Sequence, residues 1–354
     1  MKAQSFVHEG LPGRVVFGSG TLADVSTEAE RLGIRRPLIL STRGQQPLGE
    51  RVRRLLNVDS ATLFAGAKMH TPVEVTERAM AEAKQADGLI AIGGGSTIGL
   101  AKAIALRTDL PQIAVPTTYA GSEMTPILGQ SEEGLKTTLR DPRVLPETVI
   151  YDVDLTLELP WDVTITSAMN AIAHAGEALY ARDGNPFVSM IAEEAVRAIV
   201  AALPRLAAEP LGRDGRAELL YGAWMSGICL ASAGMALHHK LCHTLGGSFD
   251  LPHAPTHCVV LPHVLAFNLA VDDEARVRLA RATGSEDPAL ALHHLARANR
   301  GPVSLRELGL TEDNLERAAR LAIQNPYWNP RPFDEAAIFG LLRRAWNGEP
   351  PRAD

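Results

Sequence analysis

The chain has 354 residues, of which 46% are hydrophobic and 21% are charged, and its formal net charge is −6. The composition is that of a folded globular protein, the length favours two domains over one, and the negative charge argues against nucleic acid as a partner. The three cysteines form no CxxC pair and the first residues show no secretory signal pattern, so we expect reduced thiols in a cytoplasmic protein.

Short apolar runs alternate with helix-compatible segments along the first half of the sequence. We expect helices at 73–86 and 99–107, and strands at 15–17, 37–40, 62–64, 88–92, 112–115 and 148–151. This alternation predicts a mostly parallel sheet that is covered by helices. We therefore predict an α/β domain over residues 1–155. Such sheets bind ligands beyond the carboxyl ends of their strands.

Helical patterns dominate the second half, for example at 188–203, 216–230, 314–323 and 333–346. The longest uncharged run, 221–237, contains several glycines and serines. We expect a buried core helix there and no membrane as a partner. The pattern predicts an all-α domain over residues 156–354, with the active site in the cleft between the two domains.

Three glycines and a serine follow the expected strand at 88–92, namely Gly93, Gly94, Gly95 and Ser96. Glycines let backbone N–H groups approach a pyrophosphate, and the start of a helix adds partial positive charge. A tight turn that simply requires glycine is the alternative. The loop is neither a Walker loop nor a GxGxxG fingerprint. We predict that it binds the phosphates of a dinucleotide.

Two further loops follow expected strands. Thr117 and Thr118 come after the strand at 112–115, where hydroxyls suit contacts with a ribose or a nicotinamide amide, although an ordinary polar loop explains them equally well. Thr42 and Arg43 follow the strand at 37–40, where an acidic residue would bind the ribose 2′-OH of NADH. Without a carboxylate to repel a 2′-phosphate, we predict that NADH and NADPH are both used.

Six of the eleven histidines lie between Leu237 and His263. If residues 236–245 are helical, His239 and His243 share a face, whereas His238 points elsewhere. We expect Gly246-Gly247 to end this helix and Pro252-His253 to return the chain towards it. Asn170 and His174 are four residues apart on an earlier helix, so the set can converge in the cleft. Histidines bind metals and transfer protons near neutral pH. Four further histidines are expected to be structural or exposed: His257, His263, His293 and His294.

The glycine loop, Pro116-Thr-Thr and the spacing of His239, His243 and His253 together resemble the iron-containing (group III) alcohol dehydrogenase family. The resemblance implies an N-terminal dinucleotide-binding domain and a helical C-terminal domain. It implies that the family's histidine beside the nicotinamide falls on His243, and that its cofactor lysine falls on Lys136. The family's four metal-ligand positions fall on Asn170, His174, His239 and His253.

The sequence departs from that family at three places. Asn170 replaces the aspartate ligand, Gly99 replaces the aspartate of GGGSxxDxAK, and PTTAGTGSE reads PTTYAGSE at 116–123. With the segment Asn325-Pro-Tyr-Trp-Asn-Pro-Arg-Pro332, these changes resemble the maleylacetate reductase branch of the family. This resemblance implies NAD(P)H-dependent reduction of the carbon–carbon double bond of maleylacetate, a small dicarboxylate, to 3-oxoadipate.

The chemistry of that reaction suits the change at Asn170. An amide removes one negative charge from the ligand set, so divalent metals should bind far more weakly, and we expect no metal. Reduction of an enone needs hydrogen-bond donors for the enolate and then a proton, which histidines supply. We expect partly protonated histidines, with His243 or His253 as the acid. Arg14 and Arg331 are possible partners of the substrate carboxylates.

Three other interpretations stay open at this point. A metal-dependent (iron or zinc) alcohol or polyol dehydrogenase would retain Asn170 as a ligand. A dehydroquinate-synthase-like lyase would need an intact metal site. A catalytically inactive nucleotide-binding regulator would not be expected to keep His239, His243 and His253. Because oxidoreductases of this size often dimerise, we expect a homodimer.

Overall fold

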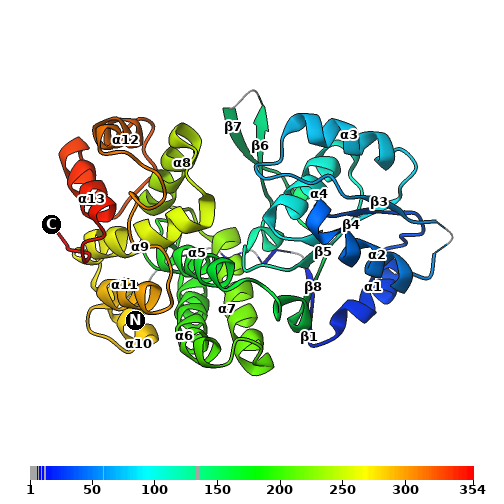
Figure 1. The fold of residues 1–354 in the computed structure, drawn as a ribbon, viewed down its shortest axis with the longest axis horizontal. Helices are drawn as coiled ribbons and strands as arrows, with labels where there is room; N and C mark the ends of the chain where they lie inside the picture. Colours follow the sequence, from blue (N-terminus) through cyan, green and yellow to red (C-terminus); the bar gives the residue numbers. More distant parts are fainter. Residues whose placement is uncertain (1–5, 7, 9, 12, 59, 133–134) are drawn as a thin grey trace.

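The chain forms a part built on a parallel sheet and a helical part, which lie side by side (Figure 1). The computed structural model describes residues 6, 8, 10–11, 13–58, 60–132 and 135–354, without the side chains of Leu135 and Lys136. The first part holds the sheet and helices α1 to α4, and the second part begins at helix α5. The predicted fold class is confirmed.

Six parallel strands form the main sheet, in the order β1-β8-β5-β4-β2-β3. All six predicted strands are confirmed: β1 (Arg14–Gly18), β2 (Pro37–Leu40), β3 (Thr62–Phe64), β4 (Gly88–Gly93), β5 (Gln112–Pro116) and β8 (Thr148–Asp152). Ile39, Ile90 and Ile113 lie opposite one another across β2, β4 and β5. Because the strands are parallel, the loops that follow β2, β4 and β5 meet at one edge of the sheet.

Helices cover both faces of this sheet. Ile39, Ile90 and Ile113 belong to one buried cluster together with residues of α1 (Val25–Arg31) and α2 (Gln46–Leu55). Leu38, Leu89 and Ala114, their neighbours in the strands, belong to a second cluster with α3 (Val73–Ala83) and α4 (Gly95–Thr108). Burial on both sides explains why these strands read as continuous apolar runs.

An antiparallel hairpin that the sequence did not predict follows β5. It consists of β6 (Ile127–Glu132) and β7 (Leu135–Arg140). Both strands contain polar and small residues, so they lack the clear apolar alternation that indicates a strand. In Figure 1 the hairpin stands beside α8 and α4, between the two parts of the chain.

The second part contains nine helices within the residues that the structure describes: α5 (Trp161–Leu179), α6 (Pro186–Ala208), α7 (Arg213–Ser232), α8 (Leu237–Phe249), α9 (His253–Leu269), α10 (Asp273–Thr283), α11 (Pro288–Ala298), α12 (Leu315–Ala322) and α13 (Glu335–Asn347). One helix end was predicted wrongly. Gly246-Gly247 lies inside α8, which ends at Asp250 with a left-handed φ of 55°. A glycine pair weakens a helix but does not stop it when tertiary packing supports the next turn.

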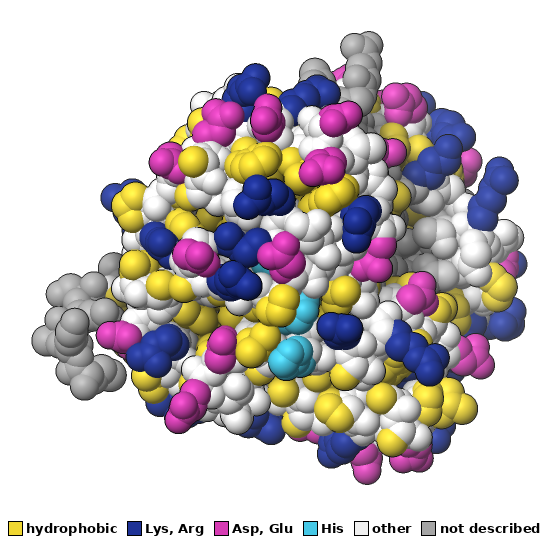
Figure 2. Space-filling view, turned by 60° about the vertical axis from the view of Figure 1, so that its left-hand side comes forward, with side chains coloured by type: hydrophobic (Ala, Val, Ile, Leu, Met, Phe, Trp, Pro, Cys, Tyr) yellow, Lys and Arg dark blue, Asp and Glu magenta, His cyan; other side chains and the backbone are white. Residues whose placement is uncertain are grey.

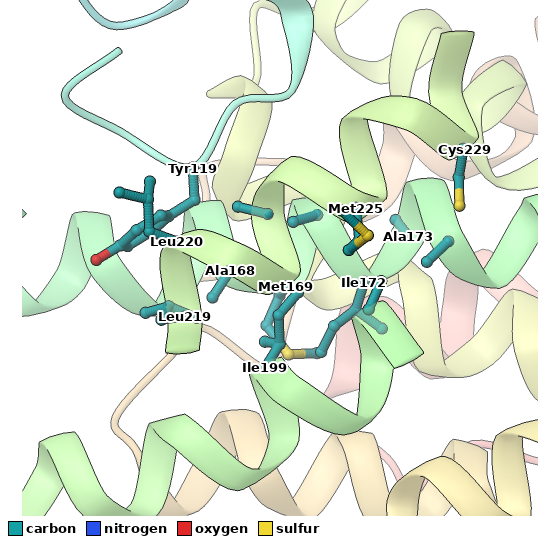
Figure 3. Close-up of a cluster of buried hydrophobic side chains, with 14 of the residues drawn as sticks. Tyr119, Ala168, Met169, Ile172, Ala173, Ile199, Leu219, Leu220, Met225 and Cys229 are labelled. Carbon is teal, nitrogen blue, oxygen red and sulfur yellow. The ribbon is translucent and has the colours of Figure 1, made fainter. Parts of the chain in front are cut away.

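The helical part packs around α5. Figure 3 shows Met169 and Ile172 of α5 among side chains of α6 and α7, with Tyr119 reaching in from the loop after β5. Arg216 of α7 is buried, and its guanidinium donates hydrogen bonds to the Tyr119 hydroxyl and to the carbonyls of Leu157 and Leu159. These contacts tie the connection between the two parts to α7. The domain boundary after residue 155 falls inside the short helix Val153–Thr156 and stays a prediction.

Within the described ranges, no single helix combines the length and the apolar character that crossing a membrane requires. The helices Arg213–Ser232 and Leu237–Phe249 reach these values only when taken together, and they are bent by 95°. Figure 2 shows basic and acidic side chains interspersed over the face that it draws.

Candidate active site

A cleft of about 680 Å³ lies between the two parts of the chain. Residues from the hairpin, the loop after β5, α5, the α7–α8 connection, α8 and α9 line it. Four predicted site residues are among them, namely His174, His239, His243 and His253. The structure thus brings together side chains that are almost 80 residues apart in the sequence, as expected.

One face of α5 carries the polar residues of the site. Asn170, His174 and Glu177 follow one another at spacings of four and three, which places them on the same side of the helix. All three are buried, with exposures of 4%, 3% and 0%. The Asn170 Oδ1 and the His174 Nδ1 have no hydrogen-bond partner among the described residues. Unpaired buried polar atoms are costly, so they indicate a place for a bound group or water.

Glu177, which the sequence analysis missed, orients one of the histidines. Its carboxylate accepts hydrogen bonds from the His239 Nδ1 at 2.7 Å, from the His238 backbone N–H at 2.7 Å and from the Ala236 backbone N–H at 2.9 Å. Burial alone would raise the pKa of Glu177, but the hydrogen bond from His239 and the nearby imidazoles lower it. The ionised carboxylate therefore holds the Nδ1 side of His239, whose Nε2 has no partner among the described residues.

The histidine rings form one contiguous cluster. His174 stacks on His239 with ring centroids 5.1 Å apart, and His257 lies 4.9 Å from His239 and 4.3 Å from His253. His257, expected to be structural, thus belongs to the cluster. Burial lowers the pKa of His174 and of His257 well below the usual range, so both rings are neutral at pH 7. The expected partial protonation is therefore wrong for His174.

His243 has a partner in the segment 325–332. Its Nδ1 lies 3.1 Å from the hydroxyl of Tyr327, which also lines the cleft. Asn329 of the same segment accepts a hydrogen bond from the backbone N–H of Leu237, the first residue of α8, and exchanges hydrogen bonds with Asn268. The segment therefore supports the start of the helix that carries His239 and His243. The unusual polar and aromatic composition of this segment can be seen in the sequence, but its contacts with α8 and α9 cannot.

The glycine loop connects β4 to α4 as predicted. A Cβ on Gly93 would lie 2.5 Å from the Thr97 Oγ1, and one on Gly94 would lie 3.0 Å from the Thr118 Oγ1. Gly93 also has a φ of 150°. Both glycines are thus required by close packing within the protein. Gly95 is exposed, and a Cβ there would make only an ordinary contact of 3.9 Å with the Cβ of Ala120. Ser96 is half-buried in the first turn of α4, where backbone N–H groups favour an anion.

The other predicted nucleotide contacts surround the same edge of the sheet. Thr42 follows β2, and Gln45, which the sequence analysis missed, donates a hydrogen bond from Nε2 to the Thr117 Oγ1 at 2.7 Å. Thr117 is only 3% exposed, whereas Thr118 is half-buried. Lys136 lies opposite Ser131 in the hairpin, and its side chain is outside the described part of the structure.

Comparisons with known proteins identify the family. Residues 12–153 match the iron-containing alcohol dehydrogenase family, and residues 164–346 match the C-terminal part of the Fe-containing alcohol dehydrogenase family. The chain belongs to the iron-containing alcohol dehydrogenase family. Its members include NAD(P)-dependent oxidoreductases that act on small molecules.

Several members are similar over their whole length. A maleylacetate reductase of Pseudomonas knackmussii is 52% identical, and the alignment covers 99% of this chain and 100% of the relative. The crystal structure of maleylacetate reductase from Agrobacterium tumefaciens is 50% identical with a TM-score of 0.95. That of maleylacetate reductase from Rhizobium sp. is 51% identical, also with a TM-score of 0.95. Both alignments cover 99% of this chain and 100% of the solved one.

The metal that the family name implies would meet a weaker donor set in this chain, because an amide stands at the family's aspartate position. Among the described residues, His238, His239 and His257 have potential ligating atoms within 4.8 Å of one another. Of these three histidines, only His239 stands at one of the family's ligand positions. Asn170 offers a neutral amide, and Glu177 already accepts three N–H bonds. A divalent cation at the family's positions would therefore meet histidines and an amide without an anionic ligand, so we expect it to bind more weakly.

The two arginines expected to bind substrate carboxylates are used elsewhere. Arg14 pairs with Glu28 at 2.9 Å, and neither residue lines the cleft. The Arg331 guanidinium donates to the carbonyls of Phe267 and Ala353 and stacks on the Phe267 ring. Neither arginine is among the described residues that line the cleft, so the structure gives these two expectations no support.

Proposed function

We propose that this oxidoreductase reduces the carbon–carbon double bond of maleylacetate to give 3-oxoadipate, with NADH or NADPH as the hydride donor. The observation that carries the proposal is Asn170, an amide at the family's aspartate position, on the same helix face as His174 in a cleft of buried histidines. Three relatives with identities of 50% or more are named maleylacetate reductases. We place the reaction in bacterial breakdown of aromatic compounds.

The predicted nucleotide-binding residues keep their assignment in this proposal. NAD(P)H, when bound, supplies a hydride to the substrate carbon that is β to the ketone. Gly95 and Ser96 at the start of α4 contact the pyrophosphate, while Gly93 and Gly94 hold the turn that presents them. The remaining proposed contacts come from the neighbouring loops and the hairpin: Thr42, Thr117, Thr118 and Lys136.

The histidine cluster stabilises the enolate and supplies the proton. The Nδ1 of the neutral His174 has no partner among the described residues, so it can carry the proton that hydrogen-bonds the ketone oxygen as this oxygen gains negative charge. The Asn170 amide can donate to the same oxygen from its Nδ2. His243 or His253 gives a proton to the carbon α to the ketone, which completes the reduction. Contact between its Nδ1 and the Tyr327 hydroxyl orients the His243 ring in the cleft.

We propose that this chemistry proceeds without a metal, since the described donors do not form the family's ligand set. The test is metal content by mass spectrometry together with NADH oxidation by maleylacetate, before and after chelation. Metal-free protein with full activity supports the proposal. Stoichiometric iron or zinc with chelator-sensitive activity would instead establish a metal-dependent alcohol or polyol dehydrogenase in which Asn170 is a ligand.

Two expectations about the cellular form of the protein also stay proposals. Cys229, Cys242 and Cys258 are free and buried, which suits the reducing cytoplasm. We propose that the protein is a homodimer there, and sedimentation of the purified protein tests this assignment.

A further inference from the structure

One arginine lines the cleft, and neither the histidine cluster nor the nucleotide loops account for it. We propose that Arg140 binds a carboxylate of the substrate and so makes the cleft selective for dicarboxylates. The inference rests on the proposed function, because it concerns the substrate of the same cleft. Arg140 would be a specificity-determining residue and would take no part in hydride or proton transfer.

The hairpin directs Arg140 into the cleft. Arg140 is the last residue of β7 and pairs with Ile127 of β6, which also lines the cleft. Thr138, two residues earlier in β7, lines it too, as the alternation of side chains along a strand requires. The hairpin therefore provides one wall of the cleft, whose other residues include the histidines of α8 and α9.

A single hydrogen bond fixes the guanidinium. The Arg140 Nη2 donates to the carbonyl of Ala231 in the last turn of α7 at 2.7 Å. Among the described residues, no carboxylate lies within 4.0 Å of this guanidinium. The guanidinium groups of Arg14, Arg143 and Arg213, in contrast, form salt bridges with carboxylates. A guanidinium has five N–H donors, so those left over can hold a carboxylate with two parallel bonds. Anchoring to the protein lowers the entropy cost of that contact.

The charges around the cleft leave Arg140 as the group that can attract an anion. It is the one lysine or arginine among the described lining residues. Asp183 also lines the cleft, and its Oδ1 accepts a hydrogen bond from the Gly234 N–H. A dianionic substrate that enters beside Asp183 needs a fixed positive charge, and burial keeps His174 neutral.

Adipate serves as the probe, because it is a six-carbon dicarboxylate without the ketone and the double bond. Its binding would be measured by calorimetry for the wild type and for the variants R140Q, R140K and R276Q. Arg276 is a matched control, since it is exposed on α10 and its guanidinium pairs with Asp273, away from the residues that line the cleft. Maleylacetate kinetics would be recorded for the same proteins, and thermal unfolding would confirm that each is folded.

We expect R140Q to weaken adipate binding and to raise KM for maleylacetate by about 10- to 100-fold, the usual effect of losing a hydrogen bond between charged groups. The kcat should change much less, because the contact is present in the ground state and in the transition state. R140K keeps the charge but loses the planar fork, so intermediate values are expected. R276Q should match the wild type.

Wild-type adipate affinity in a folded R140Q protein would overturn the inference, as would failure of the wild type to bind adipate. If R140Q does not fold, R140K carries the test, and unchanged adipate affinity in that variant would overturn the proposed two-bond contact. Adipate binding that depends on Arg140, in a protein that does not oxidise NADH with maleylacetate, would support the inference while refuting the proposed function.

Discussion

Replacement of Glu177 by Gln tests the support behind the histidine cluster. Glu177 is fully buried, and its two oxygens accept three hydrogen bonds, two on Oε2 and one on Oε1. A glutamine can keep the two on one oxygen, but its NH₂ group then faces the His238 N–H, which also donates. At least one hydrogen bond to a charged group is lost, and each contributes about 1.5–3 kcal/mol. We expect Glu177→Gln to lower the free energy of unfolding by about 2–4 kcal/mol.

The same substitution should also slow the reaction. A carboxylate that orients a histidine through its second nitrogen typically affects activity by about 10- to 100-fold when it is removed. We therefore expect kcat for maleylacetate to fall by this factor, because the His239 Nε2 loses its fixed position. Urea unfolding followed by circular dichroism gives the stability, and NADH oxidation gives kcat.

A matched variant, Glu194→Gln, separates this effect from loss of a surface charge. Glu194 is partly exposed on α6 and pairs with Arg197, so its removal should cost about 0.2–1 kcal/mol and leave kcat unchanged. If Glu177→Gln resembles Glu194→Gln in both measurements, the assigned role of Glu177 is wrong.

Three further predictions concern the acid, the nucleotide and the response to pH. His243→Ala and His253→Ala should each lower kcat by about 100-fold, as expected for a general acid, and near wild-type kcat in both would refute the assignment. Both NADH and NADPH should support turnover, because Thr42 and Arg43 follow β2 where a carboxylate would exclude the 2′-phosphate; a kcat/KM for NADPH more than about a thousandfold below that for NADH would contradict this. Burial lowers the pKa of His263 to about 3. Its folded pKa lies below the unfolded one, so the stability due to the neutral ring decreases as pH falls from about 6.5 towards 3, by about 1.4 kcal/mol per pH unit. Urea unfolding should show that the free energy of unfolding falls less between pH 7 and pH 5 for His263→Leu than for the wild type. An equal fall in both proteins would contradict the assigned contribution of His263.

The elements with a strong hydrophobic pattern were predictable from the sequence. The four inner strands of the main sheet, β2, β4, β5 and β8, are buried on both faces, so each reads as an apolar run that ends close to where the strand ends. The edge strands β1 and β3 are half-buried but keep a short apolar run. The hairpin formed by β6 and β7 was missed, because its two strands mix polar and small residues with few apolar ones, and even the buried position 130 carries a glutamine. Gly246-Gly247 misled the assignment of α8, since helix propensity is weaker than the packing around that helix.

Within the candidate site, the sequence predicts which residues share one face of a helix, but it does not predict which helices lie next to each other. Asn170 and His174 were found by their separation of four, and Glu177 obeys the same rule three residues later on the same face. Its role depends on α8 arriving beside α5, which no local pattern reveals. In the cleft, Tyr327 and Arg140 contact His243 and Ala231, which lie far away from them in the sequence. Long-range contacts, and not the residue types, were the missing information.

The distribution of negative charge connects the change at Asn170 with the class of substrate. In this chain the carboxylate nearest the histidines is Glu177, which lies behind His239 and is fully occupied by N–H donors. A carboxylate at position 170 would put a second negative charge on the same face of α5, where a dianionic substrate gains further negative charge as its enolate forms. At 4 Å, two like charges repel by about 4 kcal/mol even at an effective dielectric constant of 20. An amide at Asn170 removes that repulsion and keeps a hydrogen-bonding group in place. In the proposed function, the amide at Asn170 therefore both removes the anionic metal ligand and lowers the repulsion that a dianionic substrate would meet, while Arg140 supplies the attraction.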